Sequence, residues 1–149
     1  MRVSESLKQL DLSLVAVAGP FGAYVPAKRV GNLVFVAGQL PVREATLIAT
    51  GQVPSRCSVD LAREAARQCV INAVAAVQVL PGGVDQLTGV ARVGAFISSD
   101  TDFTEQPKVA DIVSGRTCDQ HVVEPREETV GVGALEVGPG GKTQLCRAS

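Results

Sequence analysis

Val30-Gly31-Asn32-Leu33-Val34-Phe35-Val36-Ala37-Gly38-Gln39-Leu40-Pro41 is the most informative segment of this chain for its fold. Its apolar residues from Leu33 to Ala37 fall on both faces of an extended chain, as in a strand that is covered on both sides. The Gly38-Gln39-Leu40-Pro41 end then stops the strand, because proline cannot donate to a ladder of hydrogen bonds. We therefore predict a half-buried or fully buried strand whose end opens onto a pocket.

The composition is that of one globular domain without a strong net charge. With 149 residues the chain can bury one hydrophobic core without a metal or a disulfide, and we predict a single domain over residues 1–149. The formal charge of -1 gives no basic surface for a phosphate backbone, and an aromatic content of 3% leaves few rings for bases to stack on. Composition therefore argues against a nucleic acid as partner.

The sequence gives no signal for export or for a membrane span. The segment Met1–Leu10 contains no apolar core of signal-peptide length, and no stretch reaches the roughly 18 apolar residues that a spanning helix needs. We expect a cytoplasmic protein that does not contact a membrane. The cysteines include no Cys-x-x-Cys pair, so we expect reduced and buried thiols. They are Cys57, Cys69, Cys118 and Cys146.

The N-terminal half is predicted to hold a short helix and three strands. Residues Ser4–Leu10 fit an amphipathic helix with both of its leucines turned inward, and Leu14–Ala18 fits a brief strand. The strand at Leu33–Ala37 is expected to pair, as a hairpin, with a second arm near Leu47–Thr50.

A long helix from Ser58 to Leu80 is the clearest element of the chain. Its apolar residues recur with a period near four, and Ser58 and Asp60 suit its N-cap and its first turn. Pro81-Gly82-Gly83 ends it. The polar residues, Gln68 and Asn72 among them, are predicted to lie mostly on the side opposite to the apolar stripe.

The C-terminal half is predicted to add a second helix between strands. Thr101 or Asp102 is expected to cap this helix, with Pro107 in its first turn, where the missing donor costs least. The predicted strands are Val90–Ile97, Val130–Leu135 and Thr143–Arg147.

This order of elements predicts an α+β domain, in which a mixed sheet carries two helices on one face. The strand at Leu33–Ala37 is apolar on both sides, so the second face of the sheet also needs a cover. We expect further copies of the chain to cover it in a closed ring, because a ring buries the same surface on every copy.

Three motifs that often mark a ligand site are weighed and set aside. Gly138–Thr143 lacks the spacing and the following helix of a phosphate-binding loop, and Gly131-Val132-Gly133 precedes no helix that would hold a dinucleotide. His121 is the only histidine, and no third ligand of suitable spacing accompanies it and Cys118. We therefore expect neither a metal nor a cofactor.

Two residues keep two interpretations each. Arg126 either neutralises neighbouring carboxylates in a solvated loop or binds a substrate carboxylate through two parallel hydrogen bonds. Tyr24 is the only tyrosine, and it either packs at a loop or forms the wall of a pocket.

Several phrases resemble the RidA family of small trimeric proteins, also called the YjgF or L-PSP family. They are Tyr24, Gly31–Pro41, Arg92–Ser99 and Asp102–Val109, and they place the chain in a divergent branch of that family. The resemblance implies a homotrimer of protomers with a chorismate-mutase-like fold and clefts between its subunits. It also implies hydrolysis of reactive enamines and imines to 2-keto acids and ammonia, with no cofactor.

The resemblance further implies roles for individual residues. Arg126 would bind the carboxylate of the substrate, Tyr24 would close the pocket, and water near the Thr129 backbone would attack the imine carbon. Electrostatic positioning would supply most of the acceleration. The residues expected to contact the substrate are Gly38, Gln39, Phe96 and Glu127.

The segment Pro125–Val130 departs from the family pattern. With Val130 in register, Glu127 occupies the position of the family's catalytic arginine, and Arg126 lies one residue early. A shift by one residue turns a side chain to the other face of a strand, so Arg126 serves only if a bulge restores its direction. In addition, Lys142 stands near the position of an acidic residue, and Ala37 replaces a serine.

Three hypotheses follow. The first is an enamine or imine deaminase. The second is a catalytically inactive trimer that binds a small metabolite in the same clefts, which an inward-facing Glu127 would favour. The third is an RNA-cleaving protein, which would need a basic surface that the charge balance does not predict.

Overall fold

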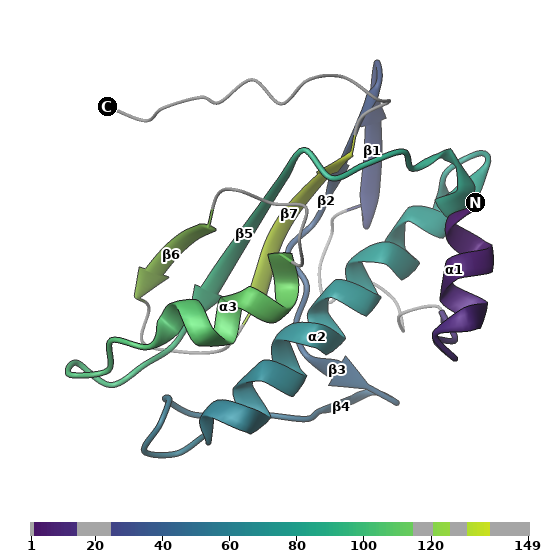
Figure 1. Ribbon diagram of the computed structural model, residues 1–149. Helices are drawn as coiled ribbons and strands as arrows, with labels where there is room; N and C mark the ends of the chain where they lie inside the picture. Colours follow the sequence, from purple (N-terminus) through teal and green to yellow (C-terminus); the bar gives the residue numbers. More distant parts are fainter. Residues whose placement is uncertain (1, 15–24, 115–120, 126–130, 138–149) are drawn as a thin grey trace.

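The computed structural model describes residues 2–14, 25–114, 121–125 and 131–137 (Figure 1). In chain order its elements are α1 (Val3–Gln9), β1 (Ala27–Val30), β2 (Leu33–Val36), β3 (Val42–Arg43), β4 (Thr46–Leu47), α2 (Val59–Ala76), the 3-10 turns η1 (Val77–Val79) and η2 (Gly83–Gln86), β5 (Arg92–Ile97), α3 (Gln106–Ser114), β6 (His121–Pro125) and β7 (Gly131–Val137). A five-stranded sheet has the order β1-β2-β7-β5-β6, and β3 and β4 form a small sheet of their own. The pairing of β5 with β6 is parallel and the other pairings are antiparallel, which confirms a mixed sheet.

The strand predicted at Leu33–Ala37 is β2, but its hairpin partner differs from the prediction. β1 pairs antiparallel with β2, with Val30 opposite Leu33, and β7 lies on the other edge of β2. The arm predicted at Leu47–Thr50 is wrong, because this part of the chain supplies β4, which pairs with β3. Gly31 explains the β1–β2 turn, since its φ of 58° lies in the left-handed region that glycine adopts at little cost. β7 confirms the strand predicted at Val130–Leu135.

The long helix α2 begins where the sequence predicts. The Ser58 hydroxyl oxygen accepts a hydrogen bond from the backbone N–H of Leu61 at 3.2 Å, so Ser58 is the N-cap. The α-helix ends at Ala76 and continues as η1. The predicted outward position of Gln68 and Asn72 is wrong, since both are buried. They lie at the border of the apolar stripe, where α2 meets the segment around β3 rather than solvent.

β5, α3 and β6 form a parallel β-α-β unit. β5 confirms the strand predicted at Val90–Ile97, and Pro107 lies in the first turn of α3 as predicted. α3 begins at Gln106, so the caps predicted at Thr101 and Asp102 are wrong, because a turn occupies residues 100–103. β6 is absent from the sequence-based prediction. Its sequence His-Val-Val-Glu-Pro does not alternate between apolar and polar residues, and its parallel pairing with β5 is made by the tertiary structure.

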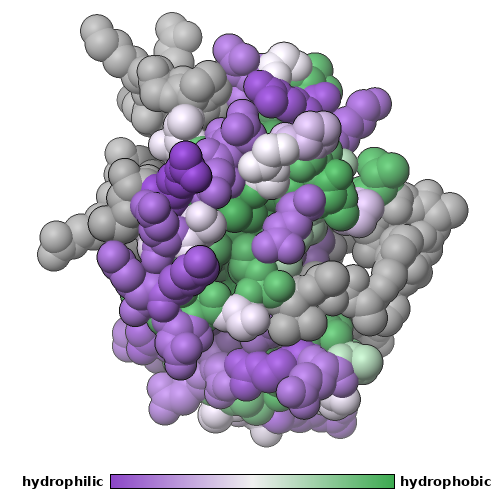
Figure 2. Space-filling model, turned by 90° about the vertical axis from the view of Figure 1, so that its right-hand side faces the viewer, coloured by the Kyte–Doolittle hydropathy of each residue, from purple (hydrophilic) through white to green (hydrophobic). Residues whose placement is uncertain are grey.

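α1 confirms the short N-terminal helix with one correction. Val3 and Leu7, four residues apart, pack against the core, whereas Leu10 lies beyond the helix end and is 64% exposed. Figure 2 looks onto the side of the molecule that carries α1 and shows hydrophobic residues gathered in a central band between polar margins. The strand predicted at Leu14–Ala18 falls mostly outside the described residues, and the one at Thr143–Arg147 falls wholly outside them.

The core lies between the sheet and the helices α2 and α3, which cover one face of it (Figure 1). On β2, Val34 and Val36 are buried in the cluster that includes residues of α2. Leu33 and Phe35 alternate with them and are 36% and 39% exposed. We call the surface that carries these two residues the open face of the sheet. No described helix covers it in the single chain, as predicted.

The cysteines in the described residues are buried thiols. Cys57 and Cys69 are 1% and 0% exposed, and neither forms a disulfide, as predicted. Cys118 and Cys146 lie outside the described residues. Within the described ranges, no helix is long and apolar enough to cross a membrane.

Candidate functional site

The strand pairings bring both ends of the segment 126–130 to the end of β5. Residues 126–130 lie outside the described chain, but the residues on either side are described. Pro125, before the segment, pairs with Ile97 of β5, and Gly131, after it, pairs with Phe96. The two ends therefore meet the last two residues of one strand, on opposite edges.

Gly38 and Gln39 lie toward the same end of the sheet. β2 runs antiparallel to β7, with Phe35 opposite Glu136 near the end of β7. Residues that follow β2 therefore lie toward the beginning of β7, where that strand pairs with Phe96. Three predicted contact residues thus converge on the part of the sheet that flanks the segment 126–130.

Gly38 and Gln39 differ in their exposure. Gln39 is 8% exposed, and its Nε2 donates a hydrogen bond to the carbonyl oxygen of Ala37 at 2.8 Å. Its side chain therefore folds back over its own backbone. Gly38 is exposed, and it has no side chain of its own to cover the backbone at this point.

Phe96 is half-buried and belongs to the open face. It alternates with Ala95 and Ile97, which are buried in the cluster that includes residues of α2 and α3. Its partner on β7 is Gly131, and its partner on β6 is Glu124. Gly131 has no side chain, so it adds no cross-strand side-chain contact to Phe96.

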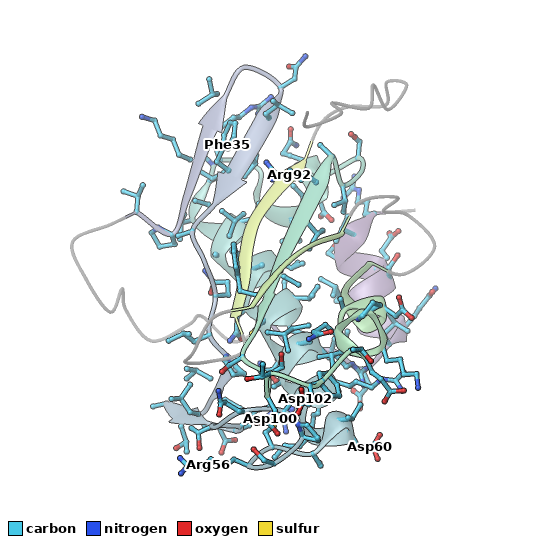
Figure 3. All side chains as sticks on the ribbon, turned by 90° about the vertical axis from the view of Figure 1, so that its left-hand side faces the viewer. Phe35, Arg56, Asp60, Arg92, Asp100 and Asp102 are labelled. Atoms are coloured by element: carbon cyan, nitrogen blue, oxygen red, sulfur yellow. The ribbon has the colours of Figure 1, made fainter. Side chains whose placement is uncertain are left out.

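A loop ties down the end of β5. The Val53 N–H donates to the Ser98 carbonyl oxygen at 3.0 Å, and the Asp100 N–H donates to the Val53 carbonyl oxygen at 2.8 Å. The backbone N–H and the hydroxyl of Ser55 donate to the two carboxylate oxygens of Asp100, at 3.1 and 2.7 Å. Figure 3 shows Asp100 at the opposite end of the molecule from Arg92, the first residue of β5. The candidate site therefore lies toward the Asp100 end of the sheet.

Ser98 is a candidate site residue that the sequence did not indicate. It directly follows β5 and is 1% exposed, and its hydroxyl has no hydrogen-bond partner among the described residues. Native structures leave few buried hydroxyls without a partner, because desolvating them costs free energy. Two consecutive serines are typical of an exposed turn, so the Ser98-Ser99 sequence does not predict that Ser98 is buried.

The structure tests only part of the predicted site. Gly38, Gln39 and Phe96 are described and lie toward one end of the sheet. Tyr24, Arg126, Glu127 and Thr129 lie outside the described residues, so their roles stay predictions. His121 begins β6, and within the described part of the chain no three metal-binding side chains come together.

Sequence and structure comparisons agree on the relatives of this chain. Residues 15–142 match the sequence model of the family described as Endoribonuclease L-PSP. Protein TCP17 of Trypanosoma cruzi is 34% identical over 109 residues, which are 73% of this chain and 68% of that protein. The matched range of the family model includes every predicted site residue, from Tyr24 to Thr129.

Two solved structures show the same fold. A proposed endoribonuclease from Shewanella oneidensis superposes with a TM-score of 0.76 at 22% identity, over 91% of this chain and 97% of that one. A protein of unknown function from Agrobacterium tumefaciens superposes with a TM-score of 0.73 at 27% identity, over 91% of each chain.

Proposed function

The chain belongs to the Endoribonuclease L-PSP family, also called the YjgF or RidA family, and from this premise we propose that it hydrolyses reactive enamines and imines. The substrates are 2-imino acids and their enamine tautomers, and the products are 2-keto acids and ammonia. The reaction needs only water as co-reactant.

One observation supports this proposal above the others. Gly38, Gln39 and Phe96 lie toward the end of the sheet where β6 ends and β7 begins. Arg126 and Thr129 are the residues of the intervening segment to which the family resemblance gives a catalytic role. A small ligand at this end of the sheet would meet an exposed glycine backbone and a half-buried aromatic ring.

The chemistry requires little more than positioning. Water adds its oxygen to the imine carbon and a proton to the nitrogen, which gives a carbinolamine. The carbon–nitrogen bond then breaks, the hydroxyl proton passes to the nitrogen through solvent, and ammonia leaves behind a carbonyl group. Fixing water and substrate in this geometry lowers the entropic part of the barrier.

Each candidate residue has a defined part in this reaction. Arg126 binds the carboxylate through two parallel hydrogen bonds, which an arginine makes better than a lysine. Tyr24 closes the pocket, and the backbone at Thr129 holds the attacking water. Gly38 and Phe96 shape the remaining walls.

A homotrimer with chorismate-mutase-like protomers is part of this proposal. The open face carries Leu33 and Phe35, both more than one-third exposed, and charged residues lie in register beside them. Lys28 pairs with Phe35, and Arg92 and Phe35 both pair with Glu136. An apolar surface bordered by charges of both signs suits contact with further copies of the same chain.

A second candidate function is favoured by the sequence of the site segment. Glu127 stands where the family pattern has its catalytic arginine, and a carboxylate in the cleft would repel an anionic substrate. In that case the trimer binds a neutral or cationic metabolite without hydrolysing it.

The deciding experiment generates 2-aminoacrylate with a pyridoxal-phosphate enzyme and follows the release of pyruvate. We expect Arg126→Ala to lower kcat/KM by about 100-fold or more, because it removes the group that holds the substrate carboxylate. Arg63→Ala is the matched control, since Arg63 is an exposed arginine of α2. Equal rates for the wild type and Arg126→Ala reject the role given to Arg126, and no rate above background in the wild type rejects the deaminase assignment.

Binding measurements separate the alternatives. Pyruvate is an anionic probe and pyruvamide is its neutral counterpart, and calorimetric titration of both shows which charge the cleft accepts. A preference for pyruvamide that is lost in Glu127→Gln supports the non-catalytic trimer. Cleavage of RNA that weakens with salt and persists in Arg126→Ala replaces both proposals with a ribonuclease.

A further inference from the structure

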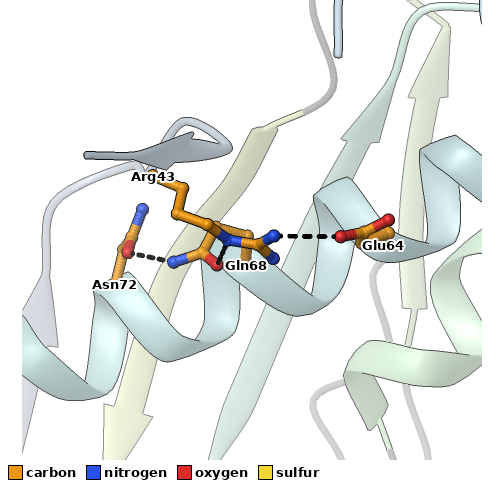
Figure 4. Close-up of polar contacts among 4 residues, drawn as sticks. All are labelled: Arg43, Glu64, Gln68 and Asn72. Atoms are coloured by element: carbon orange, nitrogen blue, oxygen red, sulfur yellow. Dashed lines mark hydrogen bonds and ion pairs between the residues drawn. The ribbon is translucent and has the colours of Figure 1, made fainter. Parts of the chain in front are cut away.

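A line of buried amides joins α2 to the segment that follows Gly38 and Gln39 (Figure 4). Gln68 and Asn72 are one helical turn apart on α2 and are 8% and 5% exposed. The Gln68 Nε2 donates a hydrogen bond to the Asn72 Oδ1 at 2.9 Å. Two buried amides beside an alanine-rich stripe cost free energy unless every polar atom is paired. Their pairing therefore shows what they hold in place.

Donors and acceptors along this line run in one direction. The Asn72 Nδ2 donates to the carbonyl oxygens of Leu40 and Val42, each at 3.0 Å, which leaves its Oδ1 to face Gln68. Gln68 then presents its Oε1 to Arg43, whose Nε donates at 3.0 Å. Because a guanidinium group has no acceptor, Arg43 fixes the orientation of both amides.

The outer end of the line lies at the surface. The Arg43 guanidinium forms an ion pair with the Glu64 carboxylate at 3.1 Å, and these side chains are 51% and 52% exposed. An exposed pair of this kind contributes little to global stability. The ion pair itself can therefore be lost at little cost to the core.

The inner end of the line holds a tight bend. The Val42 N–H donates to the Leu40 carbonyl oxygen at 2.8 Å, which closes a γ-turn around the buried Pro41. The Ile48 N–H donates to the Pro41 carbonyl oxygen at 3.0 Å. Asn72 thus binds both carbonyls that flank Pro41 and fixes the bend against α2.

Gly38 and Gln39 lie between this bend and a second anchor. On the preceding side, the Ala37 N–H donates to the Pro26 carbonyl oxygen at 3.0 Å. On the following side, the Leu40 carbonyl is held by Asn72. With both ends held, the intervening backbone has little freedom.

We propose that Asn72, oriented by Gln68 and Arg43, is a positioning residue that sets the backbone of Gly38 and Gln39 for the ligand. The inference rests on the proposed function for the nature of that ligand. The geometry of the bend does not depend on the proposed function, and it can be measured on the protein without substrate.

Gln68→Glu tests the direction of the hydrogen bonds that run from Arg43 through Gln68 to Asn72. This variant keeps an acceptor for Arg43 but removes the N–H that the Asn72 Oδ1 accepts. The Asn72 amide then forms a new hydrogen bond by turning its Nδ2 toward the carboxylate at position 68. This rotation takes its N–H donors away from the carbonyl oxygens of Leu40 and Val42. Gln78→Glu is the matched control, because it makes the same change in charge at an exposed residue of η1.

Arg43 gives an independent pair of variants that leave the core intact. Arg43→Met removes the donor that orients Gln68, whereas Arg43→Lys restores one N–H donor. We expect the effect of Arg43→Met to be largely absent in Arg43→Lys. Arg63→Met is the control for loss of an exposed arginine on α2.

The first readout is amide exchange and NMR shifts in the free protein. In Gln68→Glu and Arg43→Met, exchange of the Val42 amide should rise about tenfold, as expected for a lost buried hydrogen bond. The amide signals of Gly38 and Gln39 should move, while the melting temperature of Arg43→Met stays near that of the wild type. The second readout is kcat for 2-aminoacrylate, which should fall with little change in KM.

The outcomes separate this inference from the proposed function. Gly38 and Gln39 signals that match those of Gln78→Glu overturn the positioning role, whether or not the wild type is a deaminase. An unchanged kcat also overturns the positioning role, if it is found in an active variant whose Val42 amide exchanges faster than in the wild type. Shifted Gly38 and Gln39 signals in a protein that never hydrolyses 2-aminoacrylate support the positioning and reject the proposed reaction.

Discussion

Ser4 of α1 is joined to Asp85 of η2 by two hydrogen bonds, although 81 positions separate the two residues in the chain. The backbone N–H and the hydroxyl of Ser4 donate to the two carboxylate oxygens of Asp85, each at 2.9 Å. Hydrogen bonds to the ionised form hold the pKa of Asp85 below its ordinary value, with the backbone bond from Ser4 as the largest cause. This contact ties the N-terminal helix to η2, the turn that follows α2 and η1.

Acid should release α1 from η2. A group whose folded pKa is lowered contributes stability above its ordinary pKa and loses it as the pH falls through the lowered value, so docking should weaken below about pH 4. In Asp85→Asn, hydrogen exchange across Val3–Gln9 should be faster at neutral pH and should change less with acid. Asp11→Asn, at an exposed position, is the control. Identical acid dependence in the wild type and Asp85→Asn would contradict this assignment.

The open face should lose its partners when it gains charge. Phe35→Glu places a carboxylate in the middle of the apolar row on β2, so we expect the mass from light scattering to fall from three subunits to one. Val79→Glu makes the same kind of change at a residue that is 61% exposed and lies on η1, outside the sheet, and it should leave the mass unchanged. A wild-type protein that already has the mass of one subunit at every concentration rules out the ring.

The buried thiols should be unreactive in the folded protein. Burial raises the pKa of the Cys57 thiol, and its Sγ lies 3.7 Å from the Ser58 carbonyl oxygen. Because the thiolate is the reactive form, alkylation in a variant with Cys118 and Cys146 replaced by serine should be at least about tenfold slower in the native state than in denaturant. Equal rates in the two states would show that these sites are open.

The two serines near the end of β5 should differ in their effect on stability. The Ser98 hydroxyl is buried without a partner in the described part of the chain, so Ser98→Ala should leave the free energy of unfolding within about 0.5 kcal/mol or raise it. Ser55→Ala loses the bond from its hydroxyl to Asp100 and should lower that free energy by about 1 kcal/mol. Chemical denaturation measures both. A larger loss of unfolding free energy in Ser98→Ala means that the Ser98 hydroxyl does form a hydrogen bond.

Local signals predict the elements that a short window determines. The Ser58 N-cap and the apolar stripe that follows it predict α2, because capping and helical periodicity act within a few turns. The apolar run after Asn32 likewise predicts β2, because such a run is recognised within a few neighbouring residues. The family phrases, in turn, correctly predict the fold family.

Pairing, by contrast, depends on residues far apart in the chain. β2 was expected to pair with a segment that follows it, but its partners are β1 and the distant β7. Gln68 and Asn72 look like surface residues of α2, and only the carbonyls of the Leu40–Val42 bend explain their burial. The site residues Gly38 and Phe96 carry motif signals in the sequence, yet their convergence on one end of the sheet follows from strand order.

Local sequence features are enough to place α2 and β2 and to identify the family, since capping, periodicity and short phrases involve neighbouring residues. Which strands pair, which polar groups are buried and what those groups hold emerge only in the folded chain. Those outcomes depend on whether a donor and an acceptor from distant segments meet away from water, and no window of neighbouring residues contains that information.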